Sequence, residues 1–328
     1  MRSLIFGLPG QDSWFLSELL LDRGDDVVGC HRHTYLSDQF KDFPSGKINI
    51  IYCDMMDPKG IDEIVESVAP DEIYNLAAHS FVGDSFDKPA QVISNNVISH
   101  TNLLESVRRL SPKSKIYYSG SSEELEIKSP YGVSKAAVKH LNDIYRESYG
   151  LFICHAQNFN HSSWRHSPQF LLPKVTRYVA NLKRWLEKHK IISTDGPIVQ
   201  GQCISGNANF SWLPKLELGD LTPVRDVSYA EDVMNAAIIM MEQEKSGTYK
   251  VASGQRHNIQ YIVKCAFDTI DVNFLDFVIK NDKFIRPNES KPNLEWCPEI
   301  RALGWYPALS LKELIEITIY EYINRGIK

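Results

Sequence analysis

Short apolar runs alternate with helical patterns along the first 160 residues of the chain. The runs are apolar throughout, which is typical of strands buried on both faces of a sheet. The intervening segments place apolar residues at helical spacing, as Phe15, Leu16, Leu19 and Leu20 do. Strands are therefore predicted at residues 4–6, 26–30, 47–53, 72–76, 115–119 and 151–157. Helices are predicted at residues 12–23, 61–68, 91–110 and 131–149.

This alternation predicts the α/β class, with a Rossmann-type, doubly wound parallel sheet. Residues 1–160 are expected to form one domain, to which residues 215–243 return. The pattern beyond residue 160 is less regular. Residues 161–214 and 244–328 are expected to form a smaller, interleaved C-terminal α/β domain that binds the substrate.

Composition adds few constraints to this picture. The 328 residues carry a net charge of −5, which does not favour a nucleic-acid partner. Six cysteines show no Cys-x-x-Cys spacing, so buried reduced thiols are favoured over a metal site or disulfides. The chain reaches Gly7 too early for a signal peptide, and no apolar run approaches the ~20 residues of a membrane span. We therefore expect a cytoplasmic protein without membrane association.

A glycine-rich loop follows the first predicted strand and opens the first helix. Residues 7–13 fit Gly-x-x-Gly-x-x-Gly, with Ser13 at the third position. Gly7 allows the tight turn, and Gly10 lets the backbone approach a pyrophosphate at the helix N-terminus. Such a loop alone is weak evidence, but its place between a strand and a helix predicts a dinucleotide cofactor.

The end of the second strand indicates which dinucleotide is bound. NAD-binding loops usually place a carboxylate here for the ribose hydroxyls. This chain offers Arg32, His33 and Thr34 instead, and a cation with a hydroxyl suits a 2′-phosphate. The cofactor is therefore predicted to be NADP; the alternative is a solvated basic loop. Asp54 is placed for the adenine amine, and residues 75–78 supply small side chains beside the cofactor.

Candidate catalytic residues follow the fifth strand. Tyr131 and Lys135 are four residues apart, so they share one helix face, where the ammonium helps the phenol to act as a base. Ser121 is placed to bond the substrate hydroxyl, and Glu123 to serve as a second acid or base. The alternative for Tyr131 and Lys135 is a surface i,i+4 pair, and the alternative for Glu123 is a solvated loop carboxylate. Glu124 and its neighbour Glu126 are interpreted as solvated carboxylates.

Together, these motifs resemble the extended short-chain dehydrogenase/reductase family, and within it the GDP-mannose 4,6-dehydratases. The resemblance covers nearly the whole chain. Its segments are Gly10-Gln11-Asp12, Arg32-His33-Thr34, Glu72–Ala78, Ser121-Ser122-Glu123, Ser129–Gly132, Phe159-Asn160-His161, Leu218–Leu221, Arg225-Asp226, Arg286-Pro287 and Leu303-Gly304-Trp305.

The resemblance implies an NADP-dependent 4,6-dehydratase acting on a nucleotide sugar, with a GDP-sugar favoured. It implies oxidation at C4, loss of water across C5 and C6, and return of the hydride to C6. It also implies a homodimer or homotetramer. The implied catalytic residues are Ser121, Glu123, Tyr131 and Lys135. The implied cofactor contacts are Gly7, Gly10, Gln11, Asp12, Arg32, His33, Asp54, Met55, Leu76, Ala77, Ala78, Tyr131, Lys135 and His161. The implied substrate contacts are Ser80, Ser85, Asn160, Lys174, Arg225, Arg286 and Glu289.

Three departures keep other functions open. The link at residues 124–130 is much shorter than in the family, Ser162 replaces a family glutamate, and residues 185–213 are longer. The short link favours a 4-epimerase, 4-reductase or 4-oxidase, none of which needs Glu123. A non-catalytic protein that binds NADP or a nucleotide sugar is the third possibility. The sugar and the base are both left open.

Overall fold

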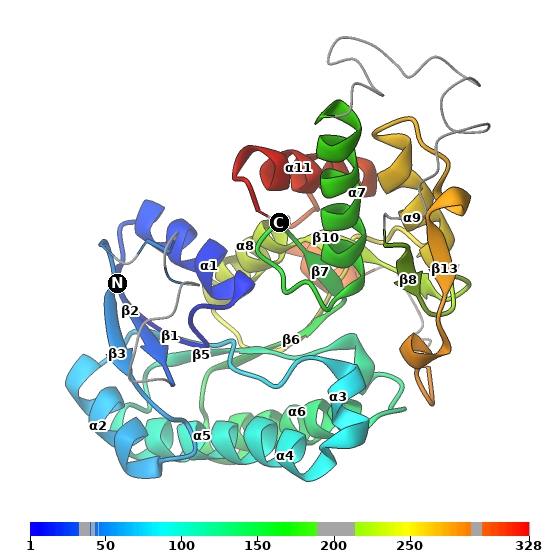
Figure 1. The fold of residues 1–328 in the computed structure, drawn as a ribbon. Helices are drawn as coiled ribbons and strands as arrows, with labels where there is room; N and C mark the ends of the chain where they lie inside the picture. Colours follow the sequence, from blue (N-terminus) through cyan, green and yellow to red (C-terminus); the bar gives the residue numbers. More distant parts are fainter. Residues whose placement is uncertain (33–39, 41–42, 45, 189–213, 290–296, 328) are drawn as a thin grey trace. The chain divides into compact units, whose positions relative to one another are not determined.

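The computed structural model describes residues 1–32, 40, 43–44, 46–188, 214–289 and 297–327. The chain forms two compact units, each built from three segments. The first unit comprises residues 1–161, 228–254 and 288–308, and the second comprises residues 162–227, 255–287 and 309–328. Figure 1 shows the ribbon and the element labels.

A seven-stranded sheet forms the centre of the first unit, in the order β11-β6-β5-β4-β1-β2-β3. Every neighbouring pair in it is parallel. Its strands are β1 (Arg2–Phe6), β2 (Asp26–His31), β3 (Asn49–Tyr52), β4 (Glu72–Asn75), β5 (Lys115–Ser119), β6 (Ile153–Asn158) and β11 (Thr248–Val251). The predicted doubly wound parallel sheet is confirmed.

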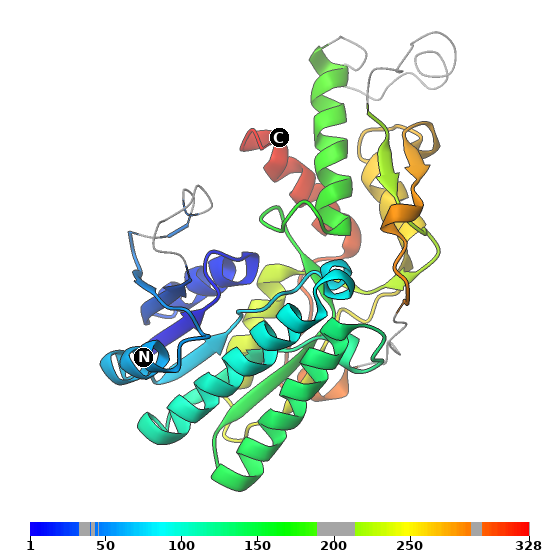
Figure 2. The ribbon, with the colours of Figure 1, turned by 60° about the horizontal axis from the view of Figure 1, so that its bottom comes forward.

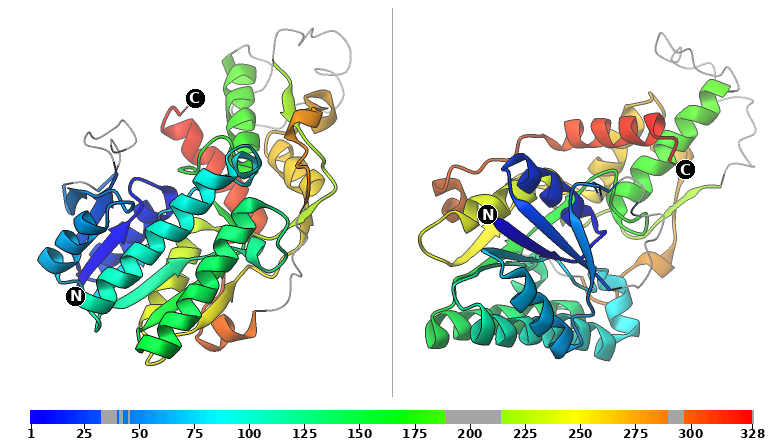
Figure 3. Two further views of the ribbon diagram at one scale, coloured as in Figure 1. Left: turned by 90° about the horizontal axis from the view of Figure 1, so that it is seen from below. Right: turned by 90° about the vertical axis from the view of Figure 1, so that its left-hand side faces the viewer.

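Both faces of the sheet are covered by helices (Figures 1 and 3). Leu4 and Phe6 belong to an apolar cluster with α2 and α5, whereas Ile5 between them belongs to another cluster with α1 and α8. Figure 2 shows α5 and α6 side by side along one face. The helices of this unit are α1 (Gln11–Asp22), α2 (Pro58–Val68), α3 (Val82–Asp87), α4 (Pro89–Ile93), α5 (Ser99–Leu110), α6 (Pro130–Tyr149), α8 (Ala230–Met241) and α10 (Pro298–Ala302).

The helix predicted at 91–110 consists of separate pieces. A π-helical turn, η2 (Ser94–Ile98), lies between α4 and α5. Polar groups occupy this region: the Asn96 side chain accepts a hydrogen bond from the His79 backbone N–H (2.8 Å) and donates to Ser134 on α6 (2.9 Å). These contacts depend on residues distant in sequence, so helical spacing alone does not predict the interruption.

The segments that complete the first unit differ from the expected ones. Residues 215–243 were expected to return to it, but the returning segment is 228–254 and a further one is 288–308. The reason is β11, which pairs with β6 from Thr248 opposite His155 to Val251 opposite Asn158. This pairing makes residues 248–251 part of the main sheet.

The second unit is smaller and has its own helices and short strands. Helix α7 (Leu171–Lys188) packs against α9 (Ile259–Asp268) and α11 (Leu311–Asn324). Strand β8 (Leu216–Leu218) pairs in parallel with β13 (Val278–Lys280), and β9 (Val224–Arg225) pairs antiparallel to β12 (His257–Asn258). The short helical turns η4 (Phe274–Asp276) and η5 (Asp282–Phe284) flank β13. The chain passes between the units at β7 (Asn160–Ser162) and β10 (Val227–Tyr229).

Two kinds of feature are missing from the described part of the chain. No helix there is long and apolar enough to cross a membrane. Over the same residues, no group of three or more His, Cys, Asp or Glu side chains is arranged to hold a metal ion. The five cysteines that the structure describes are buried free thiols; Cys203 lies outside the described residues.

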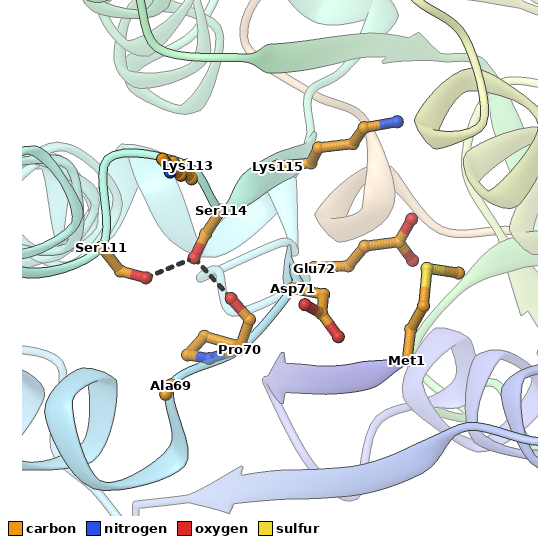
Figure 4. A pocket seen from close by; sticks show the side chains of 9 residues that line it. All are labelled: Met1, Ala69, Pro70, Asp71, Glu72, Ser111, Lys113, Ser114 and Lys115. Atoms are coloured by element: carbon orange, nitrogen blue, oxygen red, sulfur yellow. Dashed lines mark hydrogen bonds between the residues drawn. The ribbon is translucent and has the colours of Figure 1, made fainter.

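A pocket in the first unit lies at the amino ends of the strands (Figure 4). Its lining includes Glu72 and Lys115, the first residues of β4 and β5. Ligands of doubly wound sheets bind at the opposite, carboxyl edge. The predicted catalytic residues follow the carboxyl ends of the strands, so this pocket is separate from the candidate site.

Candidate active site

The carboxyl edge of the main sheet brings the predicted catalytic residues together. A short 3-10 turn, η3 (Ser122–Glu124), follows β5 and places Ser121 and Glu123 beside the start of α6. Ser129 caps α6, because its Oγ accepts a hydrogen bond from the Gly132 N–H (3.0 Å). Tyr131 therefore lies in the first turn of α6, next to η3.

The Tyr131 side chain is buried and contacts the turn. Only 6% of Tyr131 is exposed. Burial raises the pKa of its phenol well above the usual value, and a hydrogen bond with the Ser121 side chain acts in the opposite direction. The negative charges of Glu123, Glu124 and Asp12 raise the pKa of Tyr131 further. The phenol thus has a hydroxyl partner and experiences three negative charges, and it needs a nearby positive charge to act as a base.

Lys135 supplies a positive charge one helical turn away. Its Nζ donates to the Ser119 carbonyl (2.6 Å) and to the Tyr118 hydroxyl (3.2 Å), and lies 5.8 Å from the centroid of the Tyr131 ring. Burial lowers the pKa of Lys135 to about 8, although the Glu124 and Asp12 carboxylates oppose the change. The i,i+4 spacing thus brings the ammonium to the phenol in the interior and not on the surface.

Glu124 corrects the sequence interpretation. It was expected to be a solvated carboxylate, but only 2% of its side chain is exposed. It accepts hydrogen bonds from Gln157 Nε2 (2.7 Å), His155 Nε2 (2.9 Å) and the Ser121 N–H (3.4 Å). With the Ser121 side chain capping the same turn, Glu124 completes a capping box. Glu126 is partly exposed and pairs with Lys128 (3.5 Å).

A sequence signal for this buried carboxylate existed in β6. That strand contains His155, Gln157 and Asn158, and all six of its residues are buried. Buried polar side chains need hydrogen-bond partners, so three of them in one central strand indicate a polar network nearby. The pattern does not name the partner, because Glu124 is 31 residues away.

The glycine-rich loop has the features of a pyrophosphate site. Gly7 has φ +113°, and a Cβ added there would lie 2.8 Å from the Ala77 backbone nitrogen. Helix α1 begins at Gln11 after Gly10, and no described side chain caps its N-terminus. Its first N–H groups therefore suit an anion such as a pyrophosphate. The donor set fits the cofactor class predicted from the sequence.

An ion pair links the start of α1 to β7. His161 Nε2 lies 3.0 Å from the Asp12 carboxylate, and its Nδ1 lies 3.0 Å from the Phe159 carbonyl oxygen. Burial by itself would lower the pKa of His161, but the Asp12 charge and the hydrogen bonds to Asp12 and Phe159 together outweigh it, and the pKa is raised. The carboxylate also accepts a hydrogen bond from the Gln11 side chain (3.0 Å). Three predicted cofactor residues therefore form one group.

The other predicted cofactor residues that the structure describes lie along the same edge, and all of them except Met55 are at least partly exposed. Arg32 is exposed directly after β2, and His33 and Thr34 lie outside the described residues. Asp54 is exposed, and Leu76, Ala77 and Ala78 follow β4 with partial or full exposure. The Met55 side chain, in contrast, is 8% exposed and belongs to the apolar core, so only its backbone is available to a ligand.

The predicted substrate residues are distributed over both units. In the second unit, Lys174 on α7 stacks on the Phe284 ring, with Nζ 3.5 Å from the ring centroid. Burial lowers its pKa, opposed by Glu217. Arg286 follows this ring by two residues, and Arg225 lies on β9. The second unit therefore carries several half-exposed cations.

The remaining expected substrate contacts belong to the first unit. Ser80 and Asn160 are exposed and Glu289 is half-buried. Ser85 was also expected to contact the substrate, but it is fully buried and its hydroxyl donates to the Val82 carbonyl (2.7 Å). A hydroxyl in the interior of α3 is not available to a ligand in this conformation.

Comparisons with known proteins agree with this arrangement. A family model described as GDP-mannose 4,6 dehydratase matches residues 4–196 and 203–318. The Arabidopsis thaliana protein named GDP-mannose 4,6 dehydratase 2 is 30% identical over 97% of this chain and 86% of its own length. Two solved structures share the fold: Thermus thermophilus UDP-glucose 4-epimerase with NAD (TM-score 0.79, 22% identity, all of both chains) and a Pseudomonas aeruginosa protein complexed with NADPH (TM-score 0.72, 20% identity, 99% of each chain).

The ion pair between Asp12 and His161 gives a testable prediction. Asp12→Asn should lower the pKa of His161, because burial then acts without the opposing charge. In the parent protein, the stability that this pair contributes is fully present below the unfolded pKa of 6.5 and is lost as the pH rises through the raised pKa. NMR titration of the imidazole measures the shift, with Asp22→Asn at the other end of α1 as the control. An unchanged pKa in Asp12→Asn would contradict the prediction.

Proposed function

Because the chain belongs to the GDP-mannose 4,6-dehydratase family, we propose that it is an NADP-dependent 4,6-dehydratase of a GDP-mannose-like nucleotide sugar. One observation supports dehydration in particular. The Tyr131 phenol is hydrogen-bonded to Ser121 and lies close enough to Glu123 for its charge to raise the phenol pKa. A base for redox chemistry and an additional carboxylate thus stand together, and elimination of water needs both.

Each of these residues has a role in the proposed reaction. Tyr131 accepts the proton of the sugar 4-hydroxyl, and Ser121 holds that oxygen. A bound NADP supplies the hydride acceptor and donor. The 4-ketone acidifies the proton at C5, which Glu123 removes and passes to the hydroxyl at C6, so that water leaves. Lys135 favours the phenolate by its charge.

The cations of the second unit are proposed to bind the diphosphate. Lys174, Arg225 and Arg286 are half-exposed, and guanidinium and ammonium groups form strong charge-assisted hydrogen bonds to phosphate oxygens. The relative's name specifies GDP-mannose, which makes a GDP-sugar the first substrate to test. A homo-oligomer is proposed by the same resemblance.

A related activity is the second candidate. The link between Glu124 and the cap of α6 at Ser129 is short, which favours a 4-epimerase or 4-reductase that does not use Glu123. The purified protein should be incubated with NADP⁺ and a panel of GDP-, CDP- and UDP-sugars, and the products analysed by mass spectrometry. A product lighter by one water, without net NADPH, supports the dehydratase. Conversion of the sugars without water loss would replace it by the second candidate.

The role of Glu123 has its own test. Glu123→Gln should reduce kcat for dehydration by about 10²- to 10⁴-fold, because the variant lacks the base for C5, while NADP binding is unchanged. Glu126→Gln is the matched control, since Glu126 lies three residues after Glu123 and pairs with Lys128. Mass spectrometry of the product and fluorescence titration of NADPH provide the measurements. Unchanged dehydration in Glu123→Gln would exclude this residue as the base.

The cofactor preference depends on Arg32. Arg32→Ser should weaken NADP binding by about 10- to 100-fold, as expected for loss of a hydrogen bond between charged groups, and leave NAD binding unchanged. Titration of both cofactors by calorimetry measures the two affinities. Equal losses for NADP and NAD would show that Arg32 does not recognise the 2′-phosphate.

A further inference from the structure

Five buried polar side chains form a continuous line of hydrogen bonds through the first unit. It begins with Asn75 at the end of β4, continues through His100 on α5, Asn142 on α6 and His155 on β6, and ends at Glu124 in the catalytic turn. The four heavy-atom distances along it are 2.9, 2.7, 3.0 and 2.9 Å. Each of these side chains is at most 2% exposed.

The donors and acceptors along this line can be assigned from one end. The Ala77 N–H donates to Asn75 Oδ1 (3.1 Å), so the Asn75 amide nitrogen faces His100 Nδ1. His100 must then donate from Nε2 to the Asn142 oxygen, and the Asn142 nitrogen must donate to His155 Nδ1. His155 is left with a hydrogen on Nε2, which it donates to Glu124.

This assignment makes both histidines neutral. Burial lowers the pKa of His100 to about 3, in agreement with a neutral ring. A doubly protonated His155 would need an acceptor at Nδ1, and reversing Asn142 to supply one would reverse the whole line. The Asn75 amide nitrogen would then face the Ala77 N–H, and two donors would oppose each other.

We propose that His155 and Glu124 are positioning residues of the catalytic turn. The catalytic turn is Ser121 together with η3 (Ser122–Glu124). Neutral His155, oriented by the line of hydrogen bonds, holds the Glu124 carboxylate. That carboxylate fixes Ser121 and Glu123 beside Tyr131. The effect on turnover rests on the proposed function, whereas the orientation of the side chains does not.

The geometry around His155 supports this role. A Cβ added at Gly120 would lie 2.4 Å from His155 Nε2 and 2.5 Å from the Ala156 carbonyl oxygen, so a larger residue would push the ring away from Glu124. Gln157 and the Ser121 N–H are the other donors to the carboxylate. A carboxylate in the interior is stable only with such donors, and here they come from β6 and from the turn itself.

The charge of Glu124 also affects the catalytic pair. It is the largest of the influences that raise the pKa of Lys135, with Asp12 the next. It also raises the pKa of Tyr131, together with Glu123 and Asp12, against the hydrogen bond from Ser121. Removing this charge should therefore lower both pKa values. A residue with a purely structural role would not shift the pH dependence in a fixed direction.

The orientation can be tested without turnover, on the unmodified protein. NMR of the protein labelled with ¹⁵N at histidine distinguishes the tautomers, and His100→Gln and His155→Gln assign the signals. Both rings should carry hydrogen on Nε2 alone at neutral pH. A hydrogen on Nδ1 of His155, alone or with Nε2, would overturn the proposal, whether or not the protein is a dehydratase.

The effect on turnover is tested with Glu124→Gln, which keeps the size of the side chain. We expect kcat to fall about 10- to 100-fold, as for a small misplacement of catalytic groups, with KM and NADPH affinity unchanged. The acidic limb of the pH profile should move to lower pH. Glu126→Gln should match the parent protein in every measurement. A Glu124→Gln variant that also matches it would overturn the proposal.

The two arms separate this proposal from the proposed function. If His100 and His155 carry hydrogen on Nε2 alone but no nucleotide sugar is dehydrated, the proposed dehydratase function is refuted and the orientation of His155 is not. The pH profile of Glu124→Gln is then measured with whichever sugar nucleotide exchanges hydride with the cofactor. Circular dichroism of each variant shows whether it folds, and the tautomer experiment needs no Glu124 variant.

Discussion

Burial of the central sheet on both faces is the constraint on which the site depends. Every polar group placed within such a sheet loses water and must find its partner in the protein. The carboxyl edge of this sheet holds the phenol of Tyr131, the ammonium of Lys135 and the carboxylate of Glu124, all nearly inaccessible to solvent. Their low exposure strengthens each electrostatic effect between them, because the surroundings screen charges poorly. The chemistry proposed for this edge follows from that low screening.

The fold was largely predictable because its signals are local. Strands with uniformly apolar residues gave six of the seven strands of the main sheet with ends within two residues of the observed ones. Tyr131 and Lys135 were predictable for the same reason, since helical spacing alone brings them together. The seventh strand, β11, lies in the segment 244–328 that was expected to belong to the other domain, because its partner β6 is about 90 residues away in the sequence.

The failures of prediction share a long-range cause. Glu124 was taken for a surface residue because its partners, His155 and Gln157, come from another strand. Ser85 was assigned to the substrate by resemblance, and no local feature shows that α3 turns this hydroxyl into the interior. For both residues, the sequence shows the chemical type of the side chain but not the group with which it forms hydrogen bonds. A pattern of polar residues inside a buried strand is the available warning, as in β6.

The division of the first unit into three segments affects how the protein is made. During synthesis, the outer edge of β6 has no neighbour until residues 248–251 emerge from the ribosome, because β11 is the strand that covers it. An uncovered edge of a parallel sheet offers unpaired backbone groups to other chains. A nascent chain that stops near residue 161 would therefore be prone to association. The first unit cannot be isolated by a single cut, and coverage of its sheet edge depends on residues encoded far downstream.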